Sequence, residues 1–385
     1  MRILFVTASY PPFLDLGGPP RTAEALAREL SKSGNGVRVL TVNHDLRRPG
    51  FSRWLDGVRV QYLPSIVRYR SSGTIAPGAV PAAYRLVNGA DVVHIFGLYD
   101  MIGPAAGFAA RRDQVPYLVE PMGMYRPILR SLRKKRAYYA LLGRRLLSGA
   151  ARLVATSSVE RDELISGGIP PEKIVERPNG LEVSEFTALP ERGRLRGRLG
   201  IAPDVPVILF LSRLTPKKHP EMVIDVLAGR HDRSAHAVFV GPDEDGTRAR
   251  LERLATERGV AERISLTGPL HGPEKLEAFA DADVFVLPSE SENFGNVVLE
   301  ALASGLPVVV SDRCGVVSAI GPDAGYVVPP RAPEFVEAVW KVLDEGDTRR
   351  RVAVVGRTIA ERFSWDRVAA QMAEIYRTVI AGPRP

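Results

Sequence analysis

Two glutamates flank a Phe-Gly turn in the second half of the chain. Glu292 precedes the turn at Phe294 and Gly295, and Glu300 is the one polar residue within the apolar run 297–303. Because helical side chains lean toward the helix N-terminus, Glu300 should face a buried surface and reach back toward Glu292. The N–H groups of a first helical turn bind anions. Carboxylates can accept hydrogen bonds from the hydroxyls of a sugar, and the anion site beside them can bind a phosphate. Both groups occur in a sugar nucleotide.

A cluster of basic residues follows an apolar run farther toward the N-terminus. Arg213 and Lys218 come directly after the predicted strand Val207–Leu211. Ligands bind at such strand ends in open parallel sheets, and a guanidinium with an ammonium can hold phosphate oxygens. The alternative is a solvated loop with no ligand.

Two features of the first half could also contribute to a site. Gly17 and Gly18 precede Arg21 between a predicted strand and helix, and paired glycines let the backbone approach a ligand closely. The segment is not a G-x-G-x-x-G dinucleotide fingerprint, and an ordinary strand-to-helix turn explains it equally well. His94 lies inside the predicted strand Asp91–Phe96, where a satisfied core residue and a catalytic residue are both consistent with the pattern.

Residues 126–147 contain basic residues and no acidic one. Apolar residues at helical spacing accompany them, so this stretch is either a helix with its apolar stripe in the core or an amphipathic helix on an anionic membrane. The first interpretation is slightly favoured for the apolar face. The basic residues that we expect to contact an acceptor or a membrane are Arg21, Arg130, Arg133 and Lys134.

Composition limits the class of protein. A chain of 385 residues with 45% hydrophobic residues predicts two globular domains, and one cysteine excludes an intramolecular disulfide. The apolar stretch after Met1 is short and ends at a double proline, so we expect a first strand and a cytoplasmic protein. The net charge of +8 predicts an anionic partner. No zinc spacing, aromatic RNA motif or basic helix-turn-helix indicates nucleic acid. Two Asp-x-Asp pairs, at residues 243–245 and 281–283, are interpreted as structural.

Short apolar runs alternate with helical stretches, a pattern typical of parallel α/β sheets. The twelve predicted strands are Ile3–Thr7, Val37–Val42, Val58–Leu63, Asp91–Phe96, Tyr117–Glu120, Leu153–Thr156, Val207–Leu211, Ala237–Val240, Ile264–Leu266, Val284–Leu287, Pro307–Val310 and Tyr326–Val328. A Pro-Asn-Gly turn at residues 178–180 separates the two series. We expect a last helix from about residue 364 onward.

The segment Glu292–Glu300, with Leu-Glu-Ala and Gly-Leu-Pro-Val-Val beside it, resembles the E-x7-E element of retaining glycosyltransferases of the family 4 type. The resemblance implies the GT-B fold, in which two doubly wound Rossmann-like domains face a cleft and the C-terminal helix crosses back to the first domain. It implies an acceptor domain of residues 1–183 with the crossover helix 366–385, and a donor domain of residues 184–365.

The resemblance also implies roles for residues that match the family pattern. It implies a catalytic group of Glu292, Arg213, Lys218 and His94, and donor contacts from Gly17, Gly18, Asn293, Phe294, Gly295, Asn296, Glu300 and Leu270. This sequence has Met122 where many relatives have a histidine, and His219 where many have a glycine. Because of these departures, the resemblance does not say which residues of the N-terminal half bind the hexose ring of the donor.

The implied activity is transfer of a hexosyl unit from a nucleoside diphosphate sugar, with UDP as the commoner carrier, and with retention of anomeric configuration. The acceptor would be a glycan, a lipid-linked molecule or a small molecule. No metal or other cofactor is expected, and peripheral contact with the anionic inner face of a membrane is a further expectation. Three alternatives use the same binding chemistry: a GT-B epimerase, a phosphorylase and an inactive sugar-nucleotide-binding protein.

Overall fold

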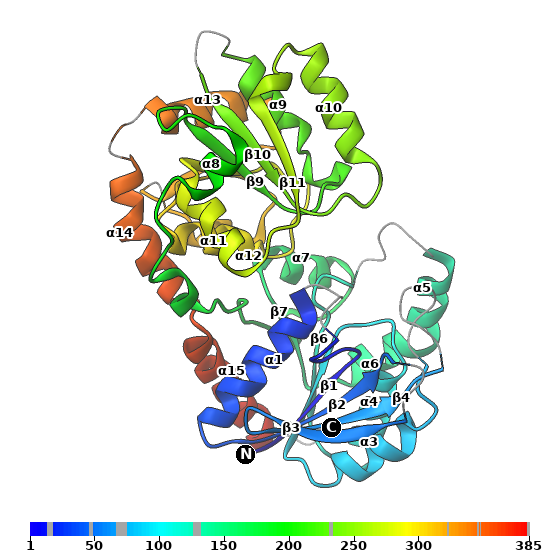
Figure 1. Cartoon of the computed structure of the whole chain (residues 1–385). Helices are drawn as coiled ribbons and strands as arrows, with labels where there is room; N and C mark the ends of the chain where they lie inside the picture. Colours follow the sequence, from blue (N-terminus) through cyan, green and yellow to red (C-terminus); the bar gives the residue numbers. More distant parts are fainter. Residues whose placement is uncertain are drawn as a thin grey trace. The chain divides into compact units, whose positions relative to one another are not determined.

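The computed structural model describes residues 1–13, 18–45, 49–66, 75–125, 132–230, 234–321, 323–344, 346 and 348–382 (Figure 1). The chain forms two compact units. The first comprises Met1–Gly180 together with Trp365–Pro385, and the second comprises Leu181–Ser364. Both boundaries lie slightly before those expected from the sequence.

The first unit is built on an eight-stranded sheet with the order β3-β4-β2-β1-β5-β6-β7-β8. All neighbouring strands are parallel except β3, which pairs antiparallel with β4. Their bounds are β1 Arg2–Thr7, β2 Gly36–Asn43, β3 Phe51–Leu55, β4 Val58–Pro64, β5 Val92–Phe96, β6 Tyr117–Glu120, β7 Arg152–Ala155 and β8 Ile174–Glu176.

Helices cover this sheet on two faces, and a separate apolar cluster fills each face. The C-terminal helix α15 packs against α1, so the last segment of the chain belongs to the first unit. The helices are α1 Gly18–Lys32, α3 Ala79–Val87, α4 Ile102–Arg112, α5 Leu132–Tyr138, the π-helical turn η1 Tyr139–Gly143, α6 Arg144–Gly149, α7 Ser158–Ser166, the 3₁₀ turn η2 Pro171–Lys173 and α15 Trp365–Ala381.

The second unit contains a six-stranded parallel sheet with the order β11-β10-β9-β12-β13-β14 around one apolar core. Its strands are β9 Val207–Leu211, β10 His236–Val240, β11 Ile264–Gly268, β12 Val284–Leu287, β13 Val308–Ser311 and β14 Gly325–Val328. Its helices are α8 Arg194–Leu199, α9 Glu221–Ala228, α10 Thr247–Glu257, α11 Gly272–Asp281, α12 Asn296–Ala303, α13 Ala332–Asp344 and α14 Thr348–Glu361. The 3₁₀ turns are η3 Val183–Phe186, η4 Pro216–Lys218, η5 Ala261–Arg263 and η6 Gly315–Ala319.

The strand order of each sheet marks the place where a ligand can bind. In the second sheet, β10 and β11 extend the sheet from one side of β9, whereas β12 pairs on the other side. The chain therefore continues from β9 and from β12 to opposite sides of the sheet, and the opening between these two strands lies at their carboxyl ends. In the first sheet, β1 is flanked by β2 and β5 in the same way.

The predicted fold class is confirmed, and all twelve predicted strands are present. The structure adds β3 and β8, which the sequence analysis did not predict. Within the described residues, no helix is both long and apolar enough to cross a bilayer.

Candidate functional site

Two loops of the second unit meet at the opening between β9 and β12. The Glu290 N–H donates to the Lys217 carbonyl across 3.0 Å. One residue farther along the first loop and two farther along the second, the Lys218 ammonium forms an ion pair with the Glu292 carboxylate. The Lys218 side chain is only 8% exposed and that of Glu292 is 23% exposed. Two residues that the sequence analysis assigned to the site are thus in direct contact.

A third loop, which follows β13, holds the backbone of Glu292 in place. The Glu292 N–H donates to the Arg313 carbonyl at 3.1 Å, and the Gly315 N–H donates to the Glu292 carbonyl at 3.0 Å. The intervening Cys314 is fully buried, and burial together with the Glu292 carboxylate raises the pKa of its thiol to about 12. This neutral thiol is therefore a packing residue of the loop.

Helix α12 begins beside this ion pair. Its N-cap residue is Gly295, with φ +95°, which has no side chain that could cap the first turn. Phe294 is 4% exposed and lies in the apolar core, and its carbonyl accepts from the Val316 N–H at 2.8 Å. The buried phenylalanine fixes the turn, so that the start of α12 directs its N–H groups and dipole to the same opening.

Glu300 is half-buried, and its partner comes from another helix. The Glu300 carboxylate lies 2.9 Å from the Lys275 ammonium of α11, and the two side chains are 19% and 22% exposed. The sequence analysis predicted the apolar surroundings of Glu300 but missed Lys275. No spacing in the sequence indicates this contact, because it joins two helices on either side of β12 in the chain.

Arg213 lies at the exposed edge of the loop after β9. Its side chain is 59% exposed and forms an ion pair with Glu244 at 3.2 Å. The backbone beneath it is fixed by the end of β10 and the loop after it. The Ser212 N–H donates to the Val240 carbonyl at 3.0 Å, and the Leu214 N–H donates to the Pro242 carbonyl at 2.9 Å. Leu270, in the loop after β11, is half-buried against the core of the same unit.

The structure corrects the assignment of His94. Its side chain is fully buried within the first unit, and its Nδ1 lies 2.7 Å from the Tyr376 hydroxyl of α15. Its Nε2 lies 3.4 Å from Glu120, which itself forms an ion pair with the buried Arg177. With no exposed surface, His94 matches the core interpretation, and the catalytic interpretation has no support here.

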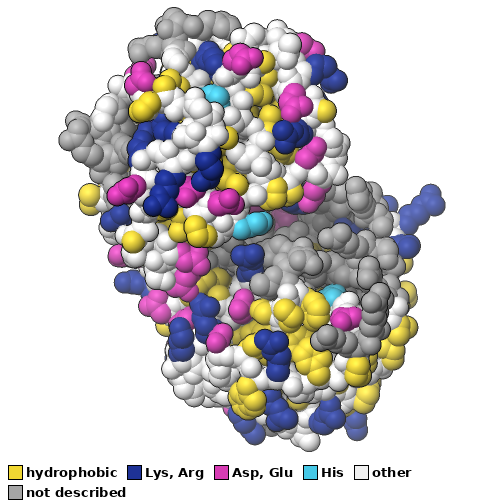
Figure 2. All heavy atoms as spheres, viewed as in Figure 1, with side chains coloured by type: hydrophobic (Ala, Val, Ile, Leu, Met, Phe, Trp, Pro, Cys, Tyr) yellow, Lys and Arg dark blue, Asp and Glu magenta, His cyan; other side chains and the backbone are white. Residues whose placement is uncertain are grey.

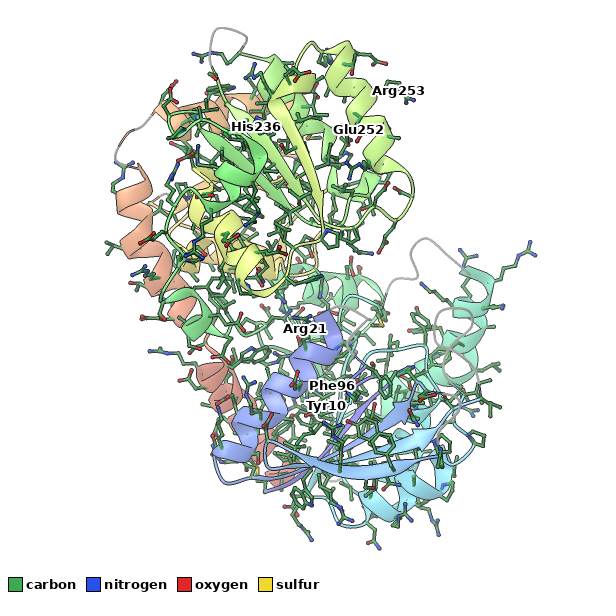
Figure 3. The ribbon with its side chains drawn as sticks, in the orientation of Figure 1. Tyr10, Arg21, Phe96, His236, Glu252 and Arg253 are labelled. Atoms are coloured by element: carbon green, nitrogen blue, oxygen red, sulfur yellow. The ribbon has the colours of Figure 1, made fainter. Side chains whose placement is uncertain are left out.

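The remaining predicted residues of the first unit occupy separate places. Gly17 and Arg130 lie outside the described residues, and Gly18 is the first residue of α1. Arg21 is exposed near the start of α1 (Figure 3), and Arg133 and Lys134 are exposed on α5.

The Asp-x-Asp pair before β12 has a structural role. Asp281 accepts hydrogen bonds from the backbone N–H groups of Gly193 and Arg196. Asp283 accepts from the guanidinium of Arg196 at 2.7 Å and from the Val207 N–H at 2.8 Å. These contacts fasten α8 to the strands. Among the described residues, no group of His, Cys, Asp and Glu has the arrangement of a metal site.

Taken together, two α/β units with largely parallel sheets, and a basic, carboxylate-containing site at a strand switch point, are typical of the GT-B class of protein. Comparison with known proteins identifies the family. Residues 17–180 match the Glycosyl transferase 4-like domain, and residues 191–358 match Glycosyl transferases group 1. The chain belongs to the GT-B glycosyltransferases of the family 4 type.

Relatives match this chain over nearly its whole length. A protein of Streptomyces bingchenggensis named D-inositol 3-phosphate glycosyltransferase is 30% identical over 96% of this chain and 86% of its own. A protein of Kineococcus radiotolerans with the same name is 28% identical over 95% and 91%.

Two solved structures show the same fold. A glycosyltransferase from Rickettsia africae superposes with a TM-score of 0.77 at 18% identity, covering 99% of this chain and 100% of its own. The Anabaena protein HepE, solved in complex with UDP-glucose, superposes with a TM-score of 0.74 at 19% identity over 98% and 100%.

Proposed function

We propose that this glycosyltransferase moves a hexosyl unit from a UDP-sugar to a glycan, a glycolipid or a small-molecule acceptor with retention of configuration. The observation that carries the proposal is the Lys218–Glu292 ion pair at the opening between β9 and β12, beside the start of α12. This arrangement places a cation and helical N–H groups next to a carboxylate. The first two can bind a diphosphate, and the carboxylate can accept from sugar hydroxyls.

Each side chain then has a part in binding or in the chemical step. Glu292 binds hydroxyls of the donor sugar, and Glu300 binds those of the ribose. Backbone N–H groups of the turn at residues 293–296 bind the sugar and the phosphate. Arg213 and Lys218 stabilise the negative charge that develops on the diphosphate as the glycosidic bond breaks. The departing phosphate accepts the proton of the acceptor hydroxyl on the same face of the sugar, which gives retention.

This arrangement differs from that of a retaining glycosidase, in which one of two carboxylates attacks the sugar. The Glu292 carboxylate is paired with Lys218, and the Glu300 carboxylate is paired with Lys275. A carboxylate that is paired with an ammonium group is a weaker nucleophile, and its oxygens can still accept hydrogen bonds. Their pairing therefore supports a binding role for both.

The cations of the site also support a reaction without a metal ion. Arg213, Lys218 and the start of α12 supply the positive field that a divalent cation would otherwise provide at a diphosphate. We expect full activity in EDTA.

UDP is the carrier that we favour, because structural neighbours were solved with UDP and with UDP-glucose. Relatives are named D-inositol 3-phosphate glycosyltransferase, so this compound is the first small-molecule acceptor to test. A glycan and a lipid-linked acceptor are the other classes.

The test is a thermal-shift screen of UDP, GDP, ADP and their glucose conjugates, followed by single-turnover reactions with labelled UDP-glucose in EDTA. We expect the UDP compounds to stabilise the protein most, and we expect a product with the α configuration of the donor by NMR. An inverted product, an epimerised donor, a reaction that requires inorganic phosphate, or a bound donor that is never consumed would each overturn the proposal.

A further inference from the structure

Helices α3, α4 and α6 and the π-helical turn η1 form an apolar groove on the first unit, and none of its lining residues belongs to the proposed donor site. Its walls are formed by apolar and basic side chains from these elements, and its apolar lining includes Val80, Met101, Pro104, Phe108, Leu141 and Leu142. Arg111 and Arg145 lie on the rim. We call these residues the apolar groove.

The apolar side chains of this groove are unusually exposed. Val80 is 50% exposed, Met101 41%, Phe108 64% and Leu141 69%. These are four of the nine large apolar residues that are strongly exposed in the described part of the chain. Such residues usually occur singly on a soluble surface, whereas a contiguous group marks a surface that contacts another apolar phase.

The charge around the groove has a single sign. The groove-forming ranges 79–87, 102–112 and 139–149 contain no Asp or Glu, and their basic residues are Arg85, Arg111, Arg112, Arg144 and Arg145. Over the whole chain, by contrast, 44 acidic residues accompany 52 basic ones. Lys and Arg side chains predominate along the lower edge of this unit in Figure 2.

These cations have few partners within the protein. Among the described residues, Arg111, Arg144 and Arg145 form no ion pair. Arg112 lies over the ring of Tyr84 at 4.8 Å. The nearest acidic residues in the sequence are Asp100, which is buried, and Asp113, which is exposed just after α4. The surface therefore keeps an uncompensated positive charge beside exposed apolar groups.

The π-helical turn contributes to this exposure. A helix over residues 132–149 that kept its regular period would carry its apolar stripe along one face. The turn at Tyr139–Gly143 widens the helix by one residue, so that Leu146 and Leu147 are buried while Leu141 projects outward. The apolar stripe expected in the core is thus divided between the core and the surface.

We propose that the apolar groove binds the surface of an anionic lipid bilayer. Phe108 and Leu141 enter the region between acyl chains and headgroups, and the surrounding arginines bind lipid phosphates. A second copy of this chain does not fit, because it would bring one basic surface against another. This inference stands apart from the proposed donor site, which lies in the second unit.

The test uses the full chain and sedimentation with vesicles of phosphatidylcholine alone or mixed with phosphatidylglycerol. We expect binding to the anionic vesicles only, with affinity falling as salt rises. The double variant Phe108→Ser/Leu141→Ser and the double variant Arg111→Glu/Arg145→Glu should each lower the partition coefficient about tenfold or more. Val354→Ser, at an apolar residue of α14 that is 71% exposed, is the control and should leave the partition coefficient unchanged.

Insertion is tested separately with Phe108→Trp. Anionic vesicles should shift its fluorescence to the blue, relative to the same titration of the wild-type chain, and brominated lipid should quench it. Unchanged melting temperatures and unchanged thermal shifts with UDP establish that the variants fold and keep the donor site. Equal binding of both vesicle types, binding that survives in the Phe108→Ser/Leu141→Ser variant, or binding of acidic polypeptide without vesicles would overturn the proposal.

Discussion

Lys218 is a charged residue with little exposed surface, and this explains much of the candidate site. An ammonium group that is 8% exposed requires a partner, and Glu292 supplies it. The sequence indicated both residues, because each follows a predicted strand and those strands lie side by side in the sheet. It could not indicate Lys275 as the partner of Glu300, because that contact depends on how two helices pack.

Replacing Lys218 with Met should reduce turnover by about a hundredfold or more, as removal of a donor to a developing oxyanion does. It should also lower the free energy of unfolding by about 1–3 kcal/mol, because the Glu292 carboxylate loses its partner. Single-turnover kinetics and denaturant unfolding measure the two effects.

The neighbouring Lys217→Met variant is the matched control and should retain most activity. In the double variant Lys218→Met/Glu292→Gln, stability should recover while activity does not. Recovery of both would show that the ion pair is only structural.

Replacing Glu300 with Gln should weaken donor affinity by about tenfold, since a neutral amide accepts more weakly from ribose hydroxyls than a carboxylate does. Calorimetric titration with UDP measures the change. Glu290→Gln, at an exposed carboxylate of the preceding loop, serves as control, and an equal loss in both variants would argue against a specific role for Glu300.

At the scale of elements, the apolar runs of the sequence predicted the central strands well. Buried parallel strands such as β9 and β12 are continuous apolar runs, and they stand out between polar loops. The two missed strands lie at the sheet edges. β3 exposes most of its residues and β8 has three, so neither carries the apolar run of a central strand.

The close approach of two loops beneath Arg213 depends on one glycine. Gly241 has φ +147°, and a Cβ there would lie 1.9 Å from the Ser212 carbonyl oxygen. Gly241→Ala should therefore displace the loop after β9, lower the melting temperature by several degrees and weaken UDP binding.

Gly246→Ala is the matched control, because Gly246 has φ +79° with no atom within 4 Å of the added Cβ. It should cost only about 1 kcal/mol of backbone strain and leave UDP affinity unchanged. Equal effects of the two substitutions would show that the loop contact is unimportant.

At the scale of the molecule, the buried group around His94 links parts of the chain that are far apart in sequence. Strand β5, strand β6 and helix α15 contribute His94, Glu120 and Tyr376, and Arg177 follows β8. A strand histidine alone does not reveal such partners, and for this reason the sequence left two interpretations open. The resulting network ties the last helix to the sheet.

This network predicts a pH dependence of stability. Burial lowers the pKa of His94, so the unfolded chain binds its proton more tightly than the folded chain. The contribution of neutral His94 to the free energy of unfolding is therefore fully present above about pH 6.5. It is lost as the pH falls toward the lower pKa that His94 has in the folded state, by up to about 1.4 kcal/mol per pH unit. Burial alone would raise the pKa of Glu120, but the Arg177 guanidinium lowers it. Glu120 therefore affects the stability only at a more acidic pH than His94 does.

Asp100 acts in the opposite direction, because burial raises its pKa to about 6. The measurement must therefore compare the wild-type chain with His94→Gln by calorimetry between pH 7.5 and 5.5. Both proteins contain Asp100, so its effect cancels in the difference between them. The wild type should lose more stability across this range than the variant. Parallel curves would contradict the assignment.

The two ends of the second unit lie next to each other. The Leu181 N–H donates to the Phe363 carbonyl at 2.7 Å, and Leu181 forms a parallel bridge with Ser364. In the first unit, the flanking Gly180 lies against the ring of Trp365. The second unit is thus an insertion with adjoining entry and exit points. Adjoining ends of this kind are the geometry that excision with a short closing turn, or replacement by the corresponding unit of another glycosyltransferase, requires.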